Sequence, residues 1–252
     1  MKKLIAFDLD GTLAESKQKI GEEMAGLLGT LLDHAAVAVI SGGDWPQFEK
    51  QVVAALPAGA PIEHFFIMPT TGTKLYRYAD GKWAPVYADI FEPDVRDHIV
   101  KALADASKEA GYSNERIWGE QIEDRGSQIT YSGLGQEAPL DAKKAWDPDF
   151  TKRKTMQRLV SAALPDLSVN IGGSTSLDIT HKGIDKAYAM HRLVEHSGIP
   201  VEDTLFLGDA IYPGGNDYSV KAAGMDTIAV RDVADTATAV RAIIACLPKR
   251  GA

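Results

Sequence analysis

The sequence predicts an α/β protein: a Rossmann-like core built on a parallel sheet and interrupted by an inserted α+β domain. Three observations predict it. Short apolar runs alternate with helical patterns near both ends of the chain, hairpin-like patterns occupy the middle, and acidic loops directly follow two of the apolar runs. Strand–helix alternation is typical of a parallel sheet with helices on its faces. The change of pattern in the middle indicates a second domain inserted into the first.

The first part of the core is predicted from this alternation. Its expected elements are a strand ending at Phe7, a helix over about 18–32, a strand over 35–40, a helix over about 45–56 and a short strand over 65–67. Two segments of alternating residues, 74–78 and 82–87, then flank Ala79-Asp80-Gly81, which is typical of a β-hairpin.

The insertion and the return to the core complete the element order. In the insertion we expect a helix over about 93–110, strands over 120–124 and 127–132, a helix over about 148–164, and strands over 167–172 and 176–180. The core pattern then returns as a helix over 184–196, a strand over 204–207, a helix over 215–222, a strand over 227–230 and a helix over 234–246. This pattern predicts a discontinuous catalytic core over residues 1–83 and 182–252 and an inserted domain over 84–181.

Composition limits the partners and the compartment. The 252 residues are 45% hydrophobic, enough for a sizeable core, and the formal net charge of −8 argues against nucleic acid or an anionic membrane as partner. An anionic small substrate is compatible with this charge, because local cations, a metal ion or helix N-termini can hold a phosphate. No apolar stretch reaches the length of a bilayer span, and the start Met1-Lys2-Lys3 is unlike a signal peptide, so we expect a cytoplasmic protein.

Cysteine and histidine chemistry is not supported by the sequence. The single cysteine, Cys246, cannot form an internal disulfide, and Ala252 stands where a cysteine-based phosphatase needs an arginine. The histidines have no metal-ligand spacing and are interpreted as structural or exposed; they are His34, His64, His98, His181, His191 and His196.

Acidic residues follow two predicted strands. Asp8 and Asp10 come directly after an apolar run, and Gly11 makes a turn plausible that brings both carboxylates to one ion or phosphate. An EF-hand is excluded, because Leu13 and Lys19 occupy the positions where that loop requires glycine and glutamate. The second acidic loop, 208–217, follows the strand at 204–207.

These loops belong to a larger set of polar groups at strand ends. Ser41 follows the second strand, Lys186 opens a helix, and Asp209 and Asp217 follow the strand at 204–207. The carboxyl ends of parallel strands share one edge, so these groups can meet there. Phosphoryl transfer needs such a set: a nucleophile, a proton donor, carboxylates for a divalent cation and a fixed positive charge. An aspartate can be the nucleophile and form an aspartyl phosphate.

In order and combination, these motifs resemble the haloacid dehalogenase superfamily, and the position of the insertion is similar to the type IIB cap of its sugar-phosphate phosphatases. Within that superfamily the chain resembles eukaryotic-type phosphomannomutases. The stretches that carry this resemblance are Asp8-Leu9-Asp10-Gly11-Thr12, Gly172–Asp178, Gly183–Lys186 and Pro213-Gly214-Gly215-Asn216-Asp217.

The resemblance implies a role for each motif. Asp8 would be the nucleophile and Asp10 the general acid and base. The implied Mg²⁺ site comprises Asp8, Asp10 through its backbone carbonyl, Asp209, Asn216 and Asp217. The implied phosphate-binding residues are Thr12, Ser41, Gly42 and Lys186, and the implied substrate-binding residues of the cap are Arg125, Ser176 and Asp178. The implied partners are a small phosphorylated sugar and a second copy of the chain, bound through the cap.

Several local alternatives stay open. Ser41 could cap the following helix, and Lys182 rivals Lys186 as the fixed cation. Arg125 could be a solvated surface residue, and Asp178 could face solvent or substrate.

Departures from the mutase pattern bear on the reaction. Trp118 and Gln136 stand where the mutase cap places arginines that hold the distal phosphate of a bisphosphate intermediate, and Lys17 replaces a third arginine. Arg116, Lys143 or Lys144 could supply the missing positive charge. We therefore expect a Mg²⁺-dependent phosphohydrolase of hexose phosphates, with phosphomannomutase as the alternative. A catalytically silent sugar-phosphate binding protein is a third, remote hypothesis.

Overall fold

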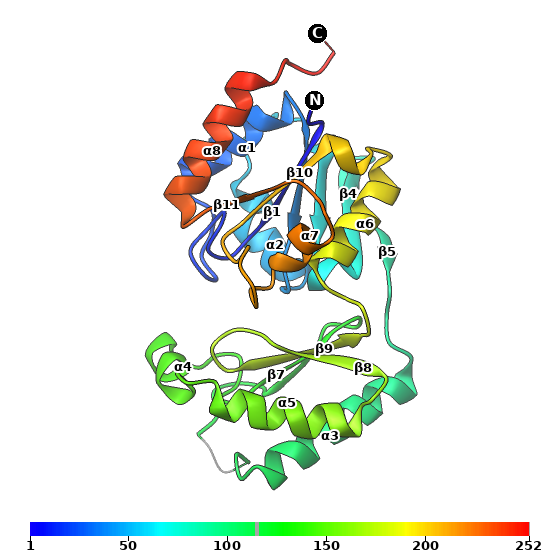
Figure 1. Ribbon diagram of the computed structural model, residues 1–252, viewed down its shortest axis with the longest axis vertical. Coiled ribbons are helices and arrows are strands. Elements are labelled where there is room, and N and C mark those ends of the chain that lie inside the picture. The colour runs from blue at the N-terminus through cyan, green and yellow to red at the C-terminus, as the bar shows by residue number, and fades with distance from the viewer. Residues whose placement is uncertain (114–115, 252) are drawn as a thin grey trace. The chain divides into compact units, whose positions relative to one another are not determined.

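The computed structural model describes residues 1–113 and 116–251 and divides into two compact units. The core unit comprises Met1–Ala88 and Asp185–Ala252, and the cap unit comprises Asp89–Ile184. Each unit has its own sheet with helices packed against it (Figure 1). The predicted class, a parallel α/β core with an inserted α+β domain, is confirmed.

The core sheet has seven strands in the order β11-β10-β1-β2-β3-β4-β5. The parallel strands are β11 (Thr227–Ala229), β10 (Thr204–Gly208), β1 (Leu4–Asp8), β2 (Ala36–Ile40) and β3 (Phe65–Met68); the antiparallel strands are β4 (Lys74–Ala79) and β5 (Lys82–Ala88). Phe7 in β1 pairs with Leu207 in β10 and with Val39 in β2. The carboxyl ends of these three strands therefore lie level at one edge, where the polar loops emerge.

Helices cover both faces of the core sheet. They are α1 (Glu22–Leu32), α2 (Trp45–Gln51), α6 (Lys186–Ser197), α7 (Tyr218–Ala222) and α8 (Val233–Cys246). Ile5 and Phe7 pack in the same cluster as residues of α1 and α8, whereas Leu4 and Ala6 pack with Met190 of α6. Successive strand residues point to opposite faces, so β1 is buried on both sides. This explains its continuous apolar sequence.

The predicted and observed helices differ most at the ends of α1 and α2. Helix α1 begins at Glu22 rather than near residue 18, because Lys17 has a left-handed backbone (φ 60°) and Gly21 is extended. Helix α2 ends at Gln51 and is followed by a separate 3₁₀ turn over Val53–Ala55. The other 3₁₀ turns are Ile62–His64, Thr70–Gly72 and Val201–Asp203.

The cap unit is a four-stranded antiparallel sheet covered on one face. Its strand order is β6 (Ile122–Asp124), β7 (Ile129–Ser132), β9 (Ser176–His181) and β8 (Leu167–Ile171), and its helices are α3 (Pro93–Glu109), α4 (Leu140–Trp146) and α5 (Thr151–Ala163). Ile129 and Ile179 pack in one cluster with residues of α3 and α5, and the alternate residues Thr130 and Asp178 line the opposite, polar face. Helix α4 was not predicted from the sequence.

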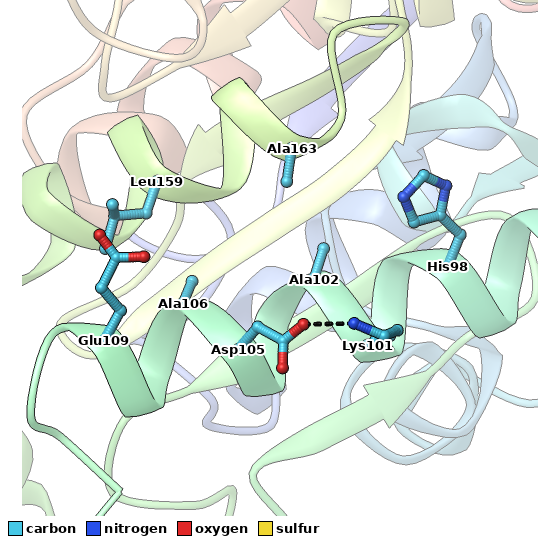
Figure 2. A pocket seen from close by; sticks show the side chains of 8 residues that line it. All are labelled: His98, Lys101, Ala102, Asp105, Ala106, Glu109, Leu159 and Ala163. Atoms are coloured by element: carbon cyan, nitrogen blue, oxygen red, sulfur yellow. Dashed lines mark hydrogen bonds and ion pairs between the residues drawn. The ribbon is translucent and has the colours of Figure 1, made fainter.

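A hollow lies between α3 and α5, within the cap unit. Figure 2 shows its lining residues, among which Lys101 pairs with Asp105 at 2.6 Å on the surface of α3. Because α3 and α5 cover the apolar face of the cap sheet, this hollow belongs to the helical layer and not to the polar face.

The division between the units lies a few residues later than the predicted boundaries of 83/84 and 181/182. Strand β5 pairs with β4 from Lys82 to Ala88, so the complete hairpin belongs to the core sheet and the chain enters the cap unit at Asp89. The return to the core falls at Asp185. None of the helices within 1–113 and 116–251 combines the length and apolar character needed to cross a bilayer.

Candidate active site

A glycine turn at the end of β1 brings two acidic loops together. Asp8 is the last residue of β1, and Gly11 has φ +91°, a conformation that suits glycine. A Cβ atom on Gly11 would lie 2.6 Å from Oδ2 of Asp209. Glycine is therefore required both by the backbone conformation and by the close approach of the Asp209 carboxylate.

Three carboxylates and one lysine form the centre of the site. Asp8, Asp209 and Asp217 each offer an oxygen within 4.8 Å of the other two. The Nζ atom of Lys186 lies 2.5 Å from Oδ1 of Asp8 and also contacts Oδ1 of Asp217. Lys186, Asp8 and Asp217 are buried, and Asp209 is partly exposed. One ammonium group cannot neutralise three carboxylates, so the cluster favours a further cation.

The donor set fits Mg²⁺. Carboxylate oxygens are hard ligands of the kind that magnesium prefers, and their excess negative charge favours a divalent ion. Oδ2 of Asp217 accepts a hydrogen bond from the Ala210 amide at 3.0 Å, which fixes its second oxygen. The hydroxyl of Thr12, predicted to bind phosphate, donates to Oδ1 of Asp209 at 3.4 Å.

Two further residues of the predicted metal site, Asp10 and Asn216, lie outside the cluster of three carboxylates. The side chain of Asp10 does not join this cluster of described carboxylates. Its Oδ1 atom accepts from the Lys17 amide at 2.7 Å, and Gln47 donates to its Oδ2 atom at 3.5 Å. The predicted metal ligand of Asp10 is its backbone carbonyl, and the position of the side chain is compatible with that prediction. Asn216 is exposed and precedes the buried Asp217.

Burial and mutual repulsion shift the titration of these groups. Burial raises the pKa of Asp8 to about 7; Lys186 opposes the shift and Asp217 adds to it. Burial, followed by repulsion from Asp217, raises the pKa of Asp209. Burial acts to lower the pKa of Lys186, but attraction by Asp8 and Asp217 outweighs it, so the net shift is upward. The lysine is therefore held as a cation, and a bound metal ion would displace protons from the carboxylates.

Ser41 lies at the end of β2 on the same sheet edge and is buried. Asp44, and not Ser41, caps helix α2, because its Oδ1 atom accepts from the Trp45 amide at 2.7 Å. The Gly43 amide donates to the Ser41 hydroxyl at 3.5 Å. Gly42, half-buried between them, completes the loop predicted to bind phosphate.

Lys186, rather than Lys182, is the lysine that reaches Asp8. Lys182 is exposed and belongs to the cap unit. Lys186 is the first residue of α6, and Asp185 caps this helix by accepting from the Tyr188 amide at 2.9 Å. This N-cap at Asp185 fixes the first turn of α6, which places Lys186 against the end of β1.

In the cap unit, Asp178 lies on the polar face of the sheet. It accepts hydrogen bonds from Thr130 at 2.7 Å and from Gln128 at 3.0 Å. Burial raises its pKa, and the charge of Arg125 opposes that shift. Arg125 itself pairs with Glu123 at 2.7 Å and is not a freely solvated side chain. Ser176 pairs in register with Ser132 at one end of the same sheet.

Sequence reasoning missed the segment that holds the Ser41 loop. The amides of Thr71 and Thr70 donate to the carbonyls of Ser41 and Gly43, both at 2.9 Å. Lys74 pairs with Asp44 at 2.7 Å. A capping aspartate before a helix was a usable signal for Asp44, whereas nothing in the spacing indicated the two threonines.

The fold and the acidic cluster define a class of α/β enzyme equipped for phosphoryl transfer at the carboxyl edge of a parallel sheet. The family of haloacid dehalogenase-like hydrolases matches residues 5–230, so the chain belongs to that family. It is an enzyme of the phosphatase and phosphotransferase type, and the resemblance drawn from the motifs is confirmed.

Particular relatives refine this assignment. The phosphomannomutase of Encephalitozoon cuniculi (strain GB-M1) is 27% identical over 230 residues, which cover 87% of this chain and 84% of that protein. Human phosphomannomutase 1 is 26% identical over 232 residues, covering 87% of this chain and 83% of that protein. These similarities extend over most of the chain, and they favour the mutase alternative over the hydrolase predicted first.

Solved structures share the fold at lower identity. The IMP-nucleotidase of Plasmodium falciparum matches with a TM-score of 0.74 at 15% identity, over 97% of this chain and 62% of that one. A haloacid dehalogenase-like hydrolase from Bacteroides thetaiotaomicron matches with a TM-score of 0.64 at 17% identity, over 96% of this chain and 100% of that one. At such identities the likeness supports the fold alone.

Proposed function

We propose that the protein is a Mg²⁺-dependent phosphomannomutase that interconverts mannose 6-phosphate and mannose 1-phosphate through an aspartyl phosphate on Asp8. The observation that carries the proposal is the similarity to phosphomannomutases over 87% of the chain. The cluster of Asp8, Lys186, Asp209 and Asp217 supports the phosphoryl-transfer chemistry that this reaction needs.

In the proposed first half-reaction, a carboxylate oxygen of Asp8 attacks phosphorus. The new oxygen–phosphorus bond forms while the bond between phosphorus and the departing sugar oxygen breaks. Asp10 gives its proton to that sugar oxygen. Asp8, Asp209 and Asp217 would hold Mg²⁺, which would supply positive charge beside the transferring group. Lys186 and the Ser41 loop bind the remaining phosphoryl oxygens.

The second half-reaction decides between mutase and hydrolase. In a mutase, the free hydroxyl of a hexose monophosphate attacks the phosphoryl group on Asp8 as the bond between phosphorus and Asp8 breaks, and it gives its proton to Asp10; this regenerates the free carboxylate and forms a hexose bisphosphate that can phosphorylate Asp8 again. In a hydrolase, water takes the place of that hydroxyl. The core unit supplies the same residues in both cases, so the difference lies in how the cap residues hold the sugar phosphate.

The hydrolase is the second candidate, because Trp118 and Gln136 carry no charge that could bind the second phosphate of a hexose bisphosphate. Two cations nevertheless lie beside these residues within the cap unit. The guanidinium of Arg116 stacks over the ring of Trp118, with its carbon 4.6 Å from the ring centroid, and Lys143 donates to the Gln136 carbonyl at 2.7 Å. Positive charge near both residues supports the mutase proposal.

The deciding experiment follows mannose 1-phosphate in Mg²⁺ buffer, with and without a hexose 1,6-bisphosphate activator. Mannose 6-phosphate and free phosphate are measured in the same reaction. We expect formation of mannose 6-phosphate that depends on the activator and exceeds phosphate release. Phosphate release without isomerisation would overturn the mutase proposal in favour of the hydrolase. Binding of sugar phosphate without either product would support the silent binding protein.

An Asp8→Asn variant is the matched control for that experiment. The substitution keeps the size of the side chain and removes the nucleophile, so both products should disappear. A variant that still turned over would exclude the aspartyl-phosphate mechanism.

A further inference from the structure

Tyr87 connects three parts of the core unit. It lies near the end of β5, one residue before Ala88, where the first segment of the core unit ends. Its hydroxyl donates to the carbonyl of Gly72 at 2.6 Å. Its ring stacks on His196, with 4.8 Å between centroids, and the guanidinium carbon of Arg192 lies 4.2 Å from its centroid. One half-buried side chain therefore contacts both the segment after β3 and helix α6.

The segment that Tyr87 contacts has an unusual backbone. Thr70 and Thr71 have φ values of 49° and 57°, in the left-handed region that β-branched residues seldom adopt. Such conformations persist only where surrounding contacts enforce them, and they are typical of functional sites. The bond from Tyr87 to the Gly72 carbonyl is one contact that holds this segment.

The same segment holds the loop predicted to bind phosphate. As described above, the Thr71 and Thr70 amides donate to the carbonyls of Ser41 and Gly43. With both carbonyls held, the Ser41 hydroxyl and the amides beside it keep a fixed direction. The contact chain therefore runs from the Tyr87 hydroxyl through Gly72 and the two threonines to Ser41.

The segment is also packed against the helix that carries Lys186. A Cβ atom on Gly72 would lie 2.4 Å from Cβ of Ala189, so the backbone of the segment rests directly on α6. Arg192 and His196, which hold the ring of Tyr87, lie on the same helix. A shift of the segment would disturb both the Ser41 loop and its contact with α6.

We infer that Tyr87 is a positioning residue: its hydroxyl holds the left-handed segment 70–72 in the conformation that fixes the Ser41–Gly43 loop for phosphate binding. The inference rests on the proposed function, because it takes Ser41 and Gly42 as phosphate ligands. It adds a residue that touches neither phosphate nor metal.

The test measures binding of inorganic phosphate to the full chain in saturating Mg²⁺ by titration calorimetry. Tyr87→Phe removes one hydrogen bond and keeps the ring, so we expect affinity to fall about 3- to 10-fold. Tyr78→Phe removes the same atom from the neighbouring strand β4 and should leave affinity unchanged. Thermal unfolding of each variant shows whether the protein stays folded at the assay temperature.

A double substitution separates positioning from general stability. Thr71→Gly removes the Cβ atom that opposes the left-handed backbone at one of the two threonines, so the segment should depend less on Tyr87. In the Thr71→Gly background, Tyr87→Phe should change phosphate affinity less than twofold. The inference would be overturned if Tyr87→Phe lowered phosphate affinity as much in the Thr71→Gly background as in the wild type. It would also be overturned if wild type and Tyr87→Phe bound phosphate equally well, or if the wild type did not bind phosphate.

The outcome is separable from that of the proposed function. If phosphate affinity depends on Tyr87 as expected but neither mannose 6-phosphate nor free phosphate forms, the inference stands and the proposed reaction is overturned. If the reaction proceeds but Tyr87→Phe binds phosphate like the wild type, the reverse holds.

Discussion

The ammonium of Lys186 lies 2.5 Å from the carboxylate of Asp8, although 178 positions of sequence separate the two residues. Both side chains are buried, and Lys186 also contacts Asp217. A buried carboxylate that loses its cation is costly, whereas a partnered one is tolerated. The contact therefore links the stability of the core unit to the charge state of the site.

Lys186→Met tests this link. The substitution leaves Asp8 and Asp217 buried without their cation, so we expect the free energy of unfolding to fall by about 3 kcal/mol or more in the absence of metal. Turnover should fall about 100-fold or more, because a fixed positive charge beside the phosphoryl group is lost. Chemical denaturation and steady-state kinetics measure the two effects.

Lys182→Met is the matched control. Lys182 is exposed and should be replaceable without either effect. Equal losses in the two variants would contradict the assignment of the fixed cation to Lys186.

The stabilising effect of Mg²⁺ should increase with pH. Burial raises the pKa of Asp8 to about 7 from an ordinary value of 3.8, so the folded protein binds more protons than the unfolded chain between these values. The contribution of Asp8 to stability is therefore greatest at low pH and is lost as the pH rises toward 7. Mg²⁺ favours the ionised carboxylates, so its stabilising effect should grow over the same range.

Thermal unfolding between pH 5.5 and 8, with EDTA or with saturating Mg²⁺, measures this behaviour. We expect the difference in Tm between the two conditions to increase with pH. An Asp8→Asn variant should show a smaller increase, because its side chain does not ionise. A metal effect that is independent of pH would argue against Asp8 as a ligand.

Gly11→Ala should disable the metal site while the protein stays folded. The added methyl group would meet the Asp209 carboxylate, and the residue would be forced to keep φ +91°. We expect a loss of roughly 1–3 kcal/mol in stability from the backbone strain and a loss of most Mg²⁺-dependent turnover. Calorimetry with Mg²⁺ alone checks the metal site directly.

Gly59→Ala isolates the backbone contribution. Gly59 has φ +81°, but a Cβ atom there would meet no atom within 4 Å. This variant should lose stability and keep its affinity for Mg²⁺. Loss of metal binding in Gly59→Ala would show that the strain alone, and not the contact with Asp209, disables the site.

The cap cations should determine how the phosphoryl group on Asp8 is used. Arg116→Gln and Lys143→Gln remove the charges that lie beside Trp118 and Gln136. If these cations hold the far end of the sugar phosphate, each substitution should lower the ratio of mannose 6-phosphate formed to phosphate released about 10-fold or more. The exposed Lys144 provides the control, and Lys144→Gln should keep the wild-type ratio.

The part of the site that lies at strand ends was predictable from the sequence. β1, β2 and β10 are short and almost wholly apolar, so their ends could be located, and parallel pairing brings those ends to one edge. Asp8, Ser41 and Asp217 follow from this rule. The direction of a side chain does not, so the bonds of the Asp10 carboxylate to the Lys17 amide and to Gln47 could not be derived from this rule.

The elements that were missed depend on tertiary contacts. Helix α4 has only seven residues and ends at Trp146, whose burial gives it a place to pack. The hairpin β4–β5 was divided between the domains, because an alternating pattern does not say which sheet a strand joins. Tyr87 contributes through one hydroxyl bonded to a main-chain carbonyl, and no residue spacing encodes such a contact.

The pairing of β1 with β10 also bears on the order of folding. Leu4 lies opposite Thr204, so the interior strand β1 obtains one neighbour, β2, early in the chain and the other, β10, only after the entire cap unit. Contacts between distant residues form slowly, because a long loop must close first. The cap sheet, by contrast, is built from residues 122–181 alone. The catalytic edge is therefore incomplete until residues that follow the inserted domain in the chain have joined the sheet.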